Sequence, residues 1–488
     1  MNRFVLIILS ICLCLSVFAQ ASEPLDLGSH RELFVDHYLI DKLDNLSLRL
    51  HEPVLRDVSF KFDLPWEGLF AGYVTMIQDN GKFRAYYRGG PTDGKDGSTT
   101  EALCVAFSDD GIHWTKPKLG LVEKNGSKEN NVIMTDIPHL MHNFAPMIDS
   151  RPGVPAEERY KALSGTIHSG GLFAFSSPDG LVWKKMSDKP VLGVLEQYTY
   201  SYDSQNVPMW SPSENCYVAY FRVVMPPFKR YIGRATSTDF LHWENVQTME
   251  VIHAGKPAPF EQFYTNQTSV YFRAPHIYIA TPARFMEGRQ VLNEDQAKGA
   301  GVNPGYFKDC SDAILLTSRG GNRYDRTFME PLIRPGIGIQ NWVSRTNYPA
   351  QHIIQTSETE MSIYVNANYA SPDAELRRYA LRLDGFASLY APYAGGTFVS
   401  KPLTFSGKRL SLNFSTSAAG GLKVQLEQVD GTPYPGFALN DCKEIIGNEI
   451  ARDVLWTNGT DVSSLAGKTV RIRMFLKDAD LYSLKFEE

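Results

Sequence analysis

Short runs of alternating apolar and polar residues, separated by turn-forming residues, occupy most of this chain. Between Val74 and Tyr87, for example, Asp79-Asn80-Gly81 interrupts two such runs and has the composition of a hairpin loop. Few stretches show the periodicity of a helix, whereas aromatic residues make up 12% of the chain and 38 glycines and 28 prolines punctuate it. We therefore predict an all-β protein.

A turn motif with the pattern Ser-x-Asp-Gly-x-x-Trp repeats along the chain. Its copies lie at 108–114, 177–183, 237–243 and, in a weaker form, 318–324. In such a turn the serine hydroxyl and the aspartate carboxylate bond backbone amides, glycine adopts the left-handed conformation, and tryptophan forms an apolar plug. This unit closes the hairpin between the last two strands of a propeller blade. We therefore expect Trp114, Trp183 and Trp243 at equivalent buried positions.

A hairpin precedes each copy of the motif, and the two features repeat in phase. A fifth hairpin, from His352 to Val365, is followed by Asp384-Gly385-Phe386 at the position of the turn. Five such units predict a five-bladed β-propeller. The blades are placed near residues 65–125, 138–195, 200–255, 260–335 and 340–395. We expect the segment from Leu33 to Val54 to supply the strand that closes the ring.

The pattern changes after Ala394-Gly395-Gly396. Residues 397–488 alternate apolar and polar positions in runs such as Leu410 to Phe414, and they contain no copy of the turn motif. Turn residues, among them Asp430-Gly431, separate these runs. We predict a C-terminal β-sandwich at 397–488, which follows a propeller domain at 22–396.

The N-terminus has the features of an export signal. Arg3 precedes an apolar run from Phe4 to Phe18, and Ala19-Gln20-Ala21 then has the small-x-small pattern that signal peptidase recognises. The apolar run is short for a membrane span, and acidic residues follow it. We expect residues 1–21 to be a signal peptide and the mature protein to be periplasmic or secreted, with no membrane partner.

Composition narrows the classes of partner and cofactor. The formal net charge of -5 is small for 488 residues and no basic stripe occurs, so we expect no nucleic-acid partner. Cys104, Cys216, Cys310 and Cys442 lie far apart without C-x-x-C spacing, and we expect free thiols rather than a zinc cluster. The sequence has no dinucleotide-binding, phosphate-loop, zinc-protease or nucleophile-elbow motif. We therefore predict neither a cofactor nor a metal site.

Together, the Ser-x-Asp-Gly-x-x-Trp turns, the five units and the trailing β-domain resemble the five-bladed propeller glycoside hydrolases. The invertase-like, arabinanase/xylosidase-like and anhydrogalactosidase-like groups are the nearest. The likeness covers the whole mature chain, but the Asn-Asp-Pro motif of the invertases does not occur. The resemblance implies a carbohydrate partner. It also implies a site at the narrow end of the central channel, to which the first strand of each blade delivers residues.

Glycoside hydrolysis requires one carboxylic acid that protonates the leaving oxygen and one carboxylate that acts as base or nucleophile. Acids near the start of a blade's first strand are therefore the candidates. Glu67 holds that place in the first blade, Asp203 in the third and Glu261 in the fourth. We predict that these three residues are catalytic. Each also has a structural interpretation, as a solvated loop residue or a turn cap.

Polar and aromatic residues at the corresponding positions are predicted to bind the substrate. They are His142, Asn143, Tyr264, Asn266, Arg284, Arg345 and Asn347. Neutral polar side chains suit sugar hydroxyl groups, and Arg345 suits a carboxylate or sulfate on the substrate. Asp312 is an alternative acid, although it comes late in its blade.

The leading interpretation is a glycoside hydrolase that acts on a polysaccharide or oligosaccharide outside the cytoplasm. Two others remain open. One is a non-catalytic glycan-binding propeller, and the other is a polysaccharide lyase, for which His142, Tyr264 and Arg345 offer a base and a uronate clamp. Convergence of the three predicted acids favours hydrolysis, dispersed acids favour binding alone, and a Tyr-His-Arg cluster favours elimination.

Overall fold

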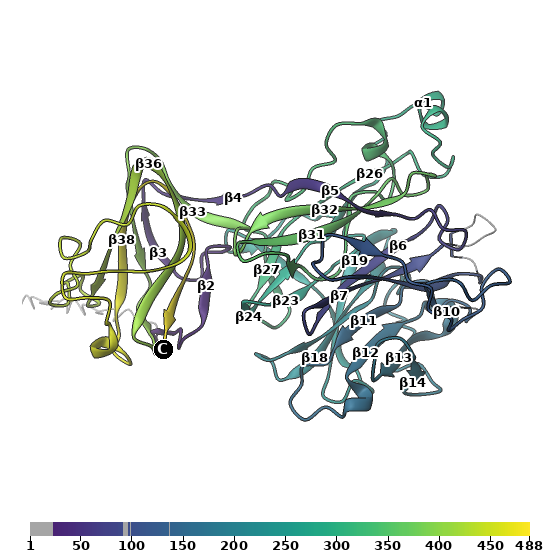
Figure 1. Ribbon diagram of the computed structural model, residues 1–488, viewed down its shortest axis with the longest axis horizontal. Coiled ribbons are helices and arrows are strands. Elements are labelled where there is room, and N and C mark those ends of the chain that lie inside the picture. Colours follow the sequence, from purple (N-terminus) through teal and green to yellow (C-terminus); the bar gives the residue numbers. More distant parts are fainter. Residues whose placement is uncertain (1–22, 91–95, 98, 136) are drawn as a thin grey trace, which may run out of the picture.

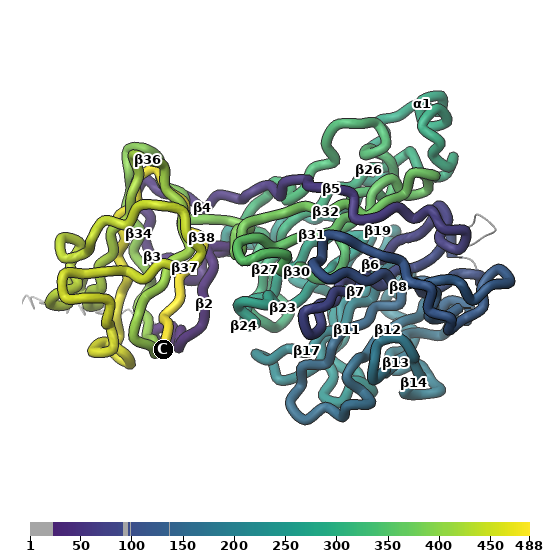
Figure 2. Tube along the Cα trace, in the orientation of Figure 1, coloured from purple at the N-terminus to yellow at the C-terminus, as the bar shows by residue number. Residues whose placement is uncertain are grey.

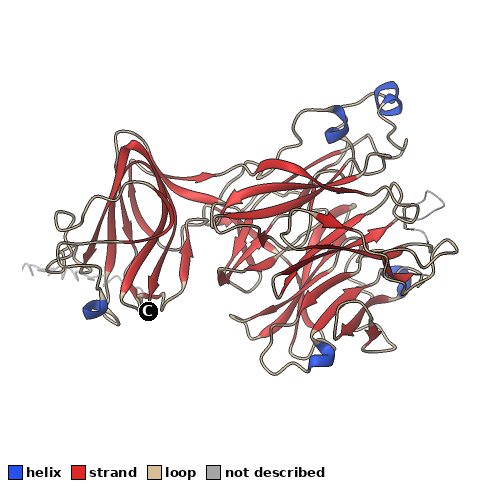
Figure 3. Cartoon of the chain, in the orientation of Figure 1, coloured by secondary structure: helices blue, strands red, loops and turns tan. Residues whose placement is uncertain are grey.

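The computed structural model describes residues 23–90, 96–97, 99–135 and 137–488. The predicted signal peptide at 1–21 lies outside these residues. Nearly all of the regular structure is strand, as Figure 3 shows. The helical segments are α1 (Glu294–Gly299) and the 3-10 turns η1 (Ala156–Glu158), η2 (Ile167–Ser169), η3 (Ile339–Trp342) and η4 (Ser463–Leu465). Within the described ranges, no helix is long and apolar enough to cross a membrane.

Five sheets form the blades of a propeller, which occupies the right-hand part of Figure 1. The first blade contains β6 (Gly72–Asp79), β7 (Lys82–Gly89), β8 (Ala102–Ser108), β9 (Trp114–Thr115) and β10 (Val132–Thr135). The second contains β11 (Ala145–Ile148), β12 (Tyr160–Ser164), β13 (Gly171–Ser177), β14 (Lys184–Lys185) and β15 (Leu192–Gly193). The third contains β16 (Tyr200–Ser201), β17 (Val207–Ser211), β18 (Cys216–Met225), β19 (Lys229–Ser237) and β20 (Glu244–Thr248).

The fourth blade is built from one stretch of chain, whereas the fifth takes one strand from the N-terminal part. The fourth contains β21 (Glu250–His253), β22 (Lys256–Pro257), β23 (Ser269–Tyr271), β24 (Ala274–Ala280), β27 (Leu316–Ser318) and β28 (Arg323–Asp325). A separate ribbon beside it pairs β25 (Ala283–Met286) with β26 (Cys310–Ala313). The fifth contains β29 (Tyr348–Pro349), β30 (Ile354–Gln355), β31 (Glu360–Ala367), β32 (Glu375–Arg382) and β5 (Val54–Lys61). The prediction of an all-β, five-bladed propeller is confirmed.

The ring is closed by a strand from the N-terminal part of the chain, but not by the segment that we expected. Strand β5 pairs antiparallel with β32 as the outer strand of the fifth blade. The segment from Leu33 to Val54 contributes only its last residue to β5. Phe34 and Leu39 are buried in the core of the C-terminal domain, so that segment is not available to the propeller.

The three complete turn motifs have the same structure. In each, the tryptophan indole N–H donates to the carbonyl oxygen of the residue three before it, at 3.1 Å for Trp114 and 3.0 Å for Trp183 and Trp243. The serine hydroxyl accepts the amide of the fourth residue, and the aspartate accepts two further amides. Phe240 replaces glycine and adopts the same left-handed φ of 71°. The three tryptophans are therefore equivalent, although they are partly rather than fully buried.

The fifth turn, at Asp384, is not a copy of the motif. Its carboxylate is fully buried and accepts hydrogen bonds from the hydroxyl groups of Tyr271 and Ser483 and the amide of Asn413. These partners belong to the fourth blade and to the C-terminal domain. Asp384 therefore joins the two domains, because a carboxylate without solvent needs several donors.

The second domain is a bent β-structure, named here the C-terminal β-domain, at the left of Figure 1. Its strands are β2 (Arg31–Leu33), β3 (Ile40–Asp44), β4 (Ser47–Leu50), β33 (Ala387–Ala391), β34 (Gly396–Ser400), β36 (Arg409–Glu427), β37 (Asn448–Asp453) and β38 (Arg471–Glu487), with β1 (Leu25–Asp26) paired to β35 (Leu403–Thr404). Figure 2 shows the purple N-terminal strands among the yellow C-terminal ones. The domain thus includes residues 25–50, which our boundaries had placed in the propeller. The four described cysteines are free thiols.

An ion pair between the first two blades makes the stability of the fold depend on pH. The Arg159 guanidinium and the Tyr160 hydroxyl bind the Asp79 carboxylate and lower its pKa to about 2, below the ordinary value near 3.9. A depressed carboxylate pKa stabilises the fold above the unfolded value, and this stabilisation is lost as pH falls through the folded value. We expect Asp79→Asn to lose roughly 1–2 kcal/mol at neutral pH, and the deficit to shrink between about pH 5 and pH 2.

This expectation is checked by urea unfolding of both proteins across that pH range. Asp188→Asn is the control, since Asp188 is exposed. A deficit that stays constant with pH would show that Asp79 acts through packing rather than charge.

Candidate functional site

One mouth of the propeller axis contains a polar cavity of about 230 Å³, named here the axial pocket. It is lined by Asp96, Gly97, His139, His142, Thr166, His168, Tyr200, Asp203 and Arg345. A second chamber of about 20 Å³ shares Arg345 and reaches Tyr73, Arg88 and Asn366. Larger cavities of about 800 and 670 Å³ lie between the propeller and the C-terminal β-domain, away from the segments that lead into the inner strands of the blades. The axial pocket is therefore the candidate site.

Several of the residues at this pocket and its adjoining chamber come from the entrance to the innermost strand of a blade. His142 precedes β11, Asp203 precedes β17 and Arg345 precedes β29, while Tyr73 lies at the start of β6. Because all inner strands begin at the same face of the propeller, short segments far apart in sequence meet at the axis. The Arg345 backbone adopts a left-handed φ of 59°, a costly conformation for a side chain that the surrounding structure must hold in place.

A layer of buried amides closes the pocket from the rest of the axis. The Gln205 amide donates to the Thr75 hydroxyl at 2.7 Å, and the Gln267 amide donates to Gln205 Oε1 at 2.7 Å. The Gln351 amide donates to the backbone carbonyl of Thr268 at the entrance to the neighbouring fourth blade, at 2.8 Å. The opposite mouth is a separate and mostly apolar cavity. The site is therefore a blind pocket rather than a through-channel.

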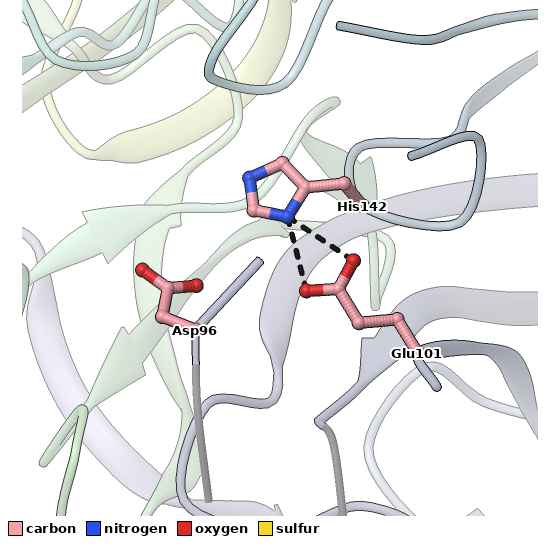
Figure 4. A group of neighbouring side chains, drawn as sticks. All are labelled: Asp96, Glu101 and His142. Carbon is pink, nitrogen blue, oxygen red and sulfur yellow. Dashed lines mark hydrogen bonds and ion pairs between the residues drawn. The ribbon is translucent and has the colours of Figure 1, made fainter. Parts of the chain in front are cut away.

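Three carboxylates and three arginines meet around His142. Arg88 Nη1 lies 3.2 Å from Asp96 and 3.4 Å from Glu101, and His142 Nδ1 lies 3.0 Å from Glu101 Oε1. Figure 4 shows His142 and Glu101 in direct contact and the Asp96 carboxylate beside them. Arg345 also binds Asp96. These contacts form one continuous ionic network along the pocket wall.

Asp203 is the accessible carboxylate of this network. Its Oδ2 is bound by the Arg222 guanidinium, and its Oδ1 lies 3.5 Å from His142 Nε2. Burial would raise the pKa of Asp203, but Arg222 and His142 hold it well below the usual range. The side chain remains 39% exposed. Asp203 is therefore an ionised carboxylate that a ligand in the pocket can touch.

Two of the three histidines that line the pocket, His142 and His139, differ in protonation. Burial and the Arg88 guanidinium would lower the pKa of His142, but Glu101 and Asp203 raise it to about 9, so it carries a proton at neutral pH. Burial and the neighbouring His168 lower the pKa of His139, which is therefore neutral. Pairs of groups whose pKa values are pushed apart are typical of acid–base sites.

Asp96, Glu101 and His142 come close enough together to suggest a metal site, since one ligand atom from each lies within 4.8 Å of the others. The position of Arg88 argues against a metal ion at this place. Its Nη1 lies 2.9 Å from His142 Nδ1 and within 3.4 Å of both carboxylates, which places a positive charge among the ligand atoms. A divalent cation would have to displace that buried guanidinium, so this donor set does not fit a metal ion.

Glu67 does not reach the axial pocket. Its side chain is fully buried in the first blade, where Lys116 Nζ donates to it at 2.7 Å and the Tyr87 hydroxyl at 2.6 Å. Burial raises its pKa despite these partners. The loop after residue 62 turns Glu67 toward β7, and Tyr73 takes the position at the axis.

Glu261 and Arg284 also lie outside the pocket. The carboxylate of Glu261 is bound by Arg284 at 2.7 Å and Arg326 at 3.0 Å, and Arg284 also binds Asp312 at 2.6 Å. These residues tie the β25–β26 ribbon to the fourth blade, and the two arginines lower the pKa of Glu261 below its ordinary value against the effect of burial. The expected convergence of three acids on one pocket is therefore not what the structure shows.

The remaining predicted residues divide into two groups. His142 and Arg345 line the pocket, and the buried ring of Tyr264 lies beneath it, 4.3 Å from the Arg222 guanidinium. Asn143, Asn266 and Asn347 are buried, and their side chains bond within the protein, mostly to backbone groups. These three amides brace the segments that carry the site.

Sequence reasoning missed four charged members of the network: Arg88, Asp96, Glu101 and Arg222. A usable signal was present for two of them. Arg88 follows Tyr86-Tyr87, and Arg222 stands between Phe221 and Val223, so each is a charge inside an apolar strand. Such a charge needs a buried partner. No local signal distinguished Asp96 and Glu101, which lie in a loop between two strands.

Comparisons with known proteins find no matching family model and no similar curated protein. Similar solved structures include a glycoside hydrolase family 43 arabinoxylan arabinofuranohydrolase from Bacillus subtilis, 12% identical, which covers 90% of this chain and 99% of that chain with a TM-score of 0.40. An N-acetylgalactosamine deacetylase from F. plautii is 12% identical, covers 70% and 96%, and has a TM-score of 0.45. A fructofuranosidase from Schwanniomyces occidentalis is 10% identical, covers 88% and 96%, and has a TM-score of 0.37. These are likenesses of fold, and neither substrate nor reaction follows from them.

Proposed function

We propose that this protein is a glycoside hydrolase whose reaction takes place in the axial pocket. The observation that carries the proposal is the pair formed by His142 and Asp203, a protonated imidazole and an ionised carboxylate 3.5 Å apart at the pocket wall. Cleavage of a glycosidic bond needs a proton for the leaving oxygen and a carboxylate for the developing positive charge. This pair supplies both without the carboxylic acid that we expected.

The roles follow from charge and access. The exposed carboxylate of Asp203 acts at the anomeric carbon as nucleophile, because the 3.5 Å between it and His142 Nε2 leaves no room for an attacking water. His142 Nε2 lies 3.5 Å from Asp203 Oδ1, so a bound substrate must replace this contact before the imidazole gives its proton to the leaving oxygen. Glu101, buried beneath the imidazole, binds Nδ1 and keeps the ring protonated and oriented. Arg222 keeps Asp203 ionised.

Reducing-end release from a panel of plant and algal polysaccharides tests the proposal. Activity that is lost when Asp203 is changed supports it. A folded protein that binds glycans but releases no reducing ends from any of them would support the non-catalytic interpretation instead.

The pH profile gives a sharper test of His142. We expect kcat/KM to fall as pH rises through about 9, because the free enzyme then loses the imidazole proton. Glu101→Gln removes the main charge that raises this pKa, so the alkaline limb should move to lower pH. Glu214→Gln is the control, since Glu214 pairs with Arg234 outside the pocket. A limb that stays in place in Glu101→Gln would rule out His142 as the proton donor.

A second reaction is favoured by the cluster of Arg345 and His139 in the same pocket. In β-elimination from a uronate, an arginine neutralises the carboxylate and a neutral base removes the adjacent proton. His139 is neutral, whereas burial raises the pKa of nearby Tyr73 far above neutrality and leaves it a poor base. Elimination leaves an unsaturated uronate that absorbs in the ultraviolet, and hydrolysis does not. Absorbance recorded during the same screen therefore separates the two reactions.

We also propose that the protein works outside the cytoplasm. This rests on the N-terminal sequence, in which Arg3, the apolar run to Phe18 and Ala19-Gln20-Ala21 form the three parts of an export signal. Expression with and without residues 1–21, followed by cell fractionation, tests it.

A further inference from the structure

An exposed group of aromatic side chains lies on the same face of the propeller as the axial pocket. Phe228, at the tip of the β18–β19 hairpin, is 51% exposed, and Phe260, at the entrance to the fourth blade, is 56% exposed. Tyr231 lies between Phe260 and the core, with its ring stacked on Phe260 at 5.5 Å and on buried Phe263 at 5.4 Å. We name Phe228, Tyr231 and Phe260 the aromatic ledge.

Hydrogen bonds and an ion pair hold the segments that carry the aromatic ledge in place. The Arg230 amide N–H donates to Gln262 Oε1 at 3.0 Å, and Lys229 Nζ and the Gln262 amide both reach Glu287 Oε2, at 3.0 and 3.1 Å. These bonds fix the third-blade hairpin against the fourth blade. Phe228 adopts a left-handed φ of 122°, a costly conformation that directs this large apolar side chain to solvent.

Contiguous contacts connect the ledge to the axial pocket. The Arg230 guanidinium lies 5.6 Å from the ring of Phe228 and 5.6 Å from the ring of Tyr264. Tyr264 in turn lies against Arg222, the partner of Asp203, and against Arg345. Packed side chains therefore connect the ledge to the pocket wall through the buried ring of Tyr264.

We propose that the aromatic ledge binds sugar rings of a glycan chain that extends out of the axial pocket, so that the substrate is polymeric. This inference rests on the proposed function. Flat aromatic faces with charged neighbours suit the apolar C–H faces of pyranose rings, whose hydroxyl groups then meet Arg230 and Lys229. Exposed apolar surface of this kind is typical of binding sites. Because the ledge is connected to the axial pocket, we infer a glycan chain that is long enough to occupy both.

The test compares the wild type with Phe228→Ala/Phe260→Ala in native gels that contain arabinoxylan, polygalacturonate or a sulfated galactan. On at least one of these polymers the wild type should be retarded, and the double variant should bind about tenfold more weakly. Phe228→Ala/Phe260→Trp should regain part of the retardation that the double alanine variant loses, because tryptophan keeps an aromatic face at position 260. Val182→Ala is the matched control, since Val182 is equally exposed on the second-blade turn at the far end of β13. Both altered phenylalanines are more than half exposed, and thermal unfolding should be unchanged.

The possible outcomes distinguish a failure of the ledge proposal from a failure of the hydrolase proposal. If reducing ends are released but retardation does not depend on the phenylalanines, or no polymer retards the wild type, the ledge proposal is overturned and the hydrolase proposal is not. If retardation depends on them but no polymer is cleaved, the ledge stands and the hydrolase proposal fails. A wild-type dimer that becomes monomeric in the double variant would make the ledge a contact between two copies and overturn it.

Discussion

Replacing Asp203 with asparagine should lower the turnover of a cleaved glycan by about 100- to 10,000-fold, because that is the usual contribution of one acid–base or nucleophilic group. Asparagine keeps the shape of the side chain but supplies no negative charge at the anomeric carbon. The same change removes one of the partners that keep His142 protonated. Substrate affinity should change much less, since the remaining pocket wall is preserved. Turnover and KM measured on the confirmed substrate check both expectations.

Glu261→Gln is the matched control for this prediction. Both acids precede an inner strand and both were candidates from sequence, but the carboxylate of Glu261 is engaged by Arg284 and Arg326 away from the pocket. The turnover of Glu261→Gln should therefore stay within a few-fold of that of the wild type. If Glu261→Gln stays folded and loses as much activity as Asp203→Asn, the axial pocket is not the centre of the reaction.

The largest effect on stability is expected from Lys116→Met. Glu67 is fully buried, and Lys116 provides its opposite charge at 2.7 Å. Removal of one partner from a buried ion pair leaves an uncompensated charge and typically costs about 3–5 kcal/mol. Protonation of Glu67, whose pKa burial already raises, will reduce this penalty, so we expect about 3 kcal/mol at neutral pH and less in acid.

Urea unfolding of Lys116→Met and of the double variant Lys116→Met/Glu67→Gln measures this coupling. The double variant should regain part of the loss, because it no longer buries a charge. Lys82→Met is the control, since Lys82 pairs with Asp109 at the surface and should matter by less than about 1 kcal/mol. A fall in turnover per folded molecule in Lys116→Met would return Glu67 to the list of catalytic candidates.

Only part of the candidate site could be predicted from the sequence. The rule that site residues precede each inner strand holds for His142, Asp203 and Arg345. It failed for Glu67 because a loop turns that side chain toward β7, and Tyr73 takes the place at the axis. An error of a few residues in the start of a strand changes which side chain faces the channel. The pattern of apolar residues does not define strand ends that closely.

By itself, the sequence determined the repeat and therefore the propeller. Each turn motif is made by residues within seven positions of one another, as from Ser108 to Trp114, so its hydrogen bonds are encoded locally. Only the tertiary structure decided which distant strands pair. Strand β5 closes the ring against β32, and residues 31–50 join the C-terminal β-domain. It also decided which charges meet at the axis, because that depends on how five blades pack around a common centre.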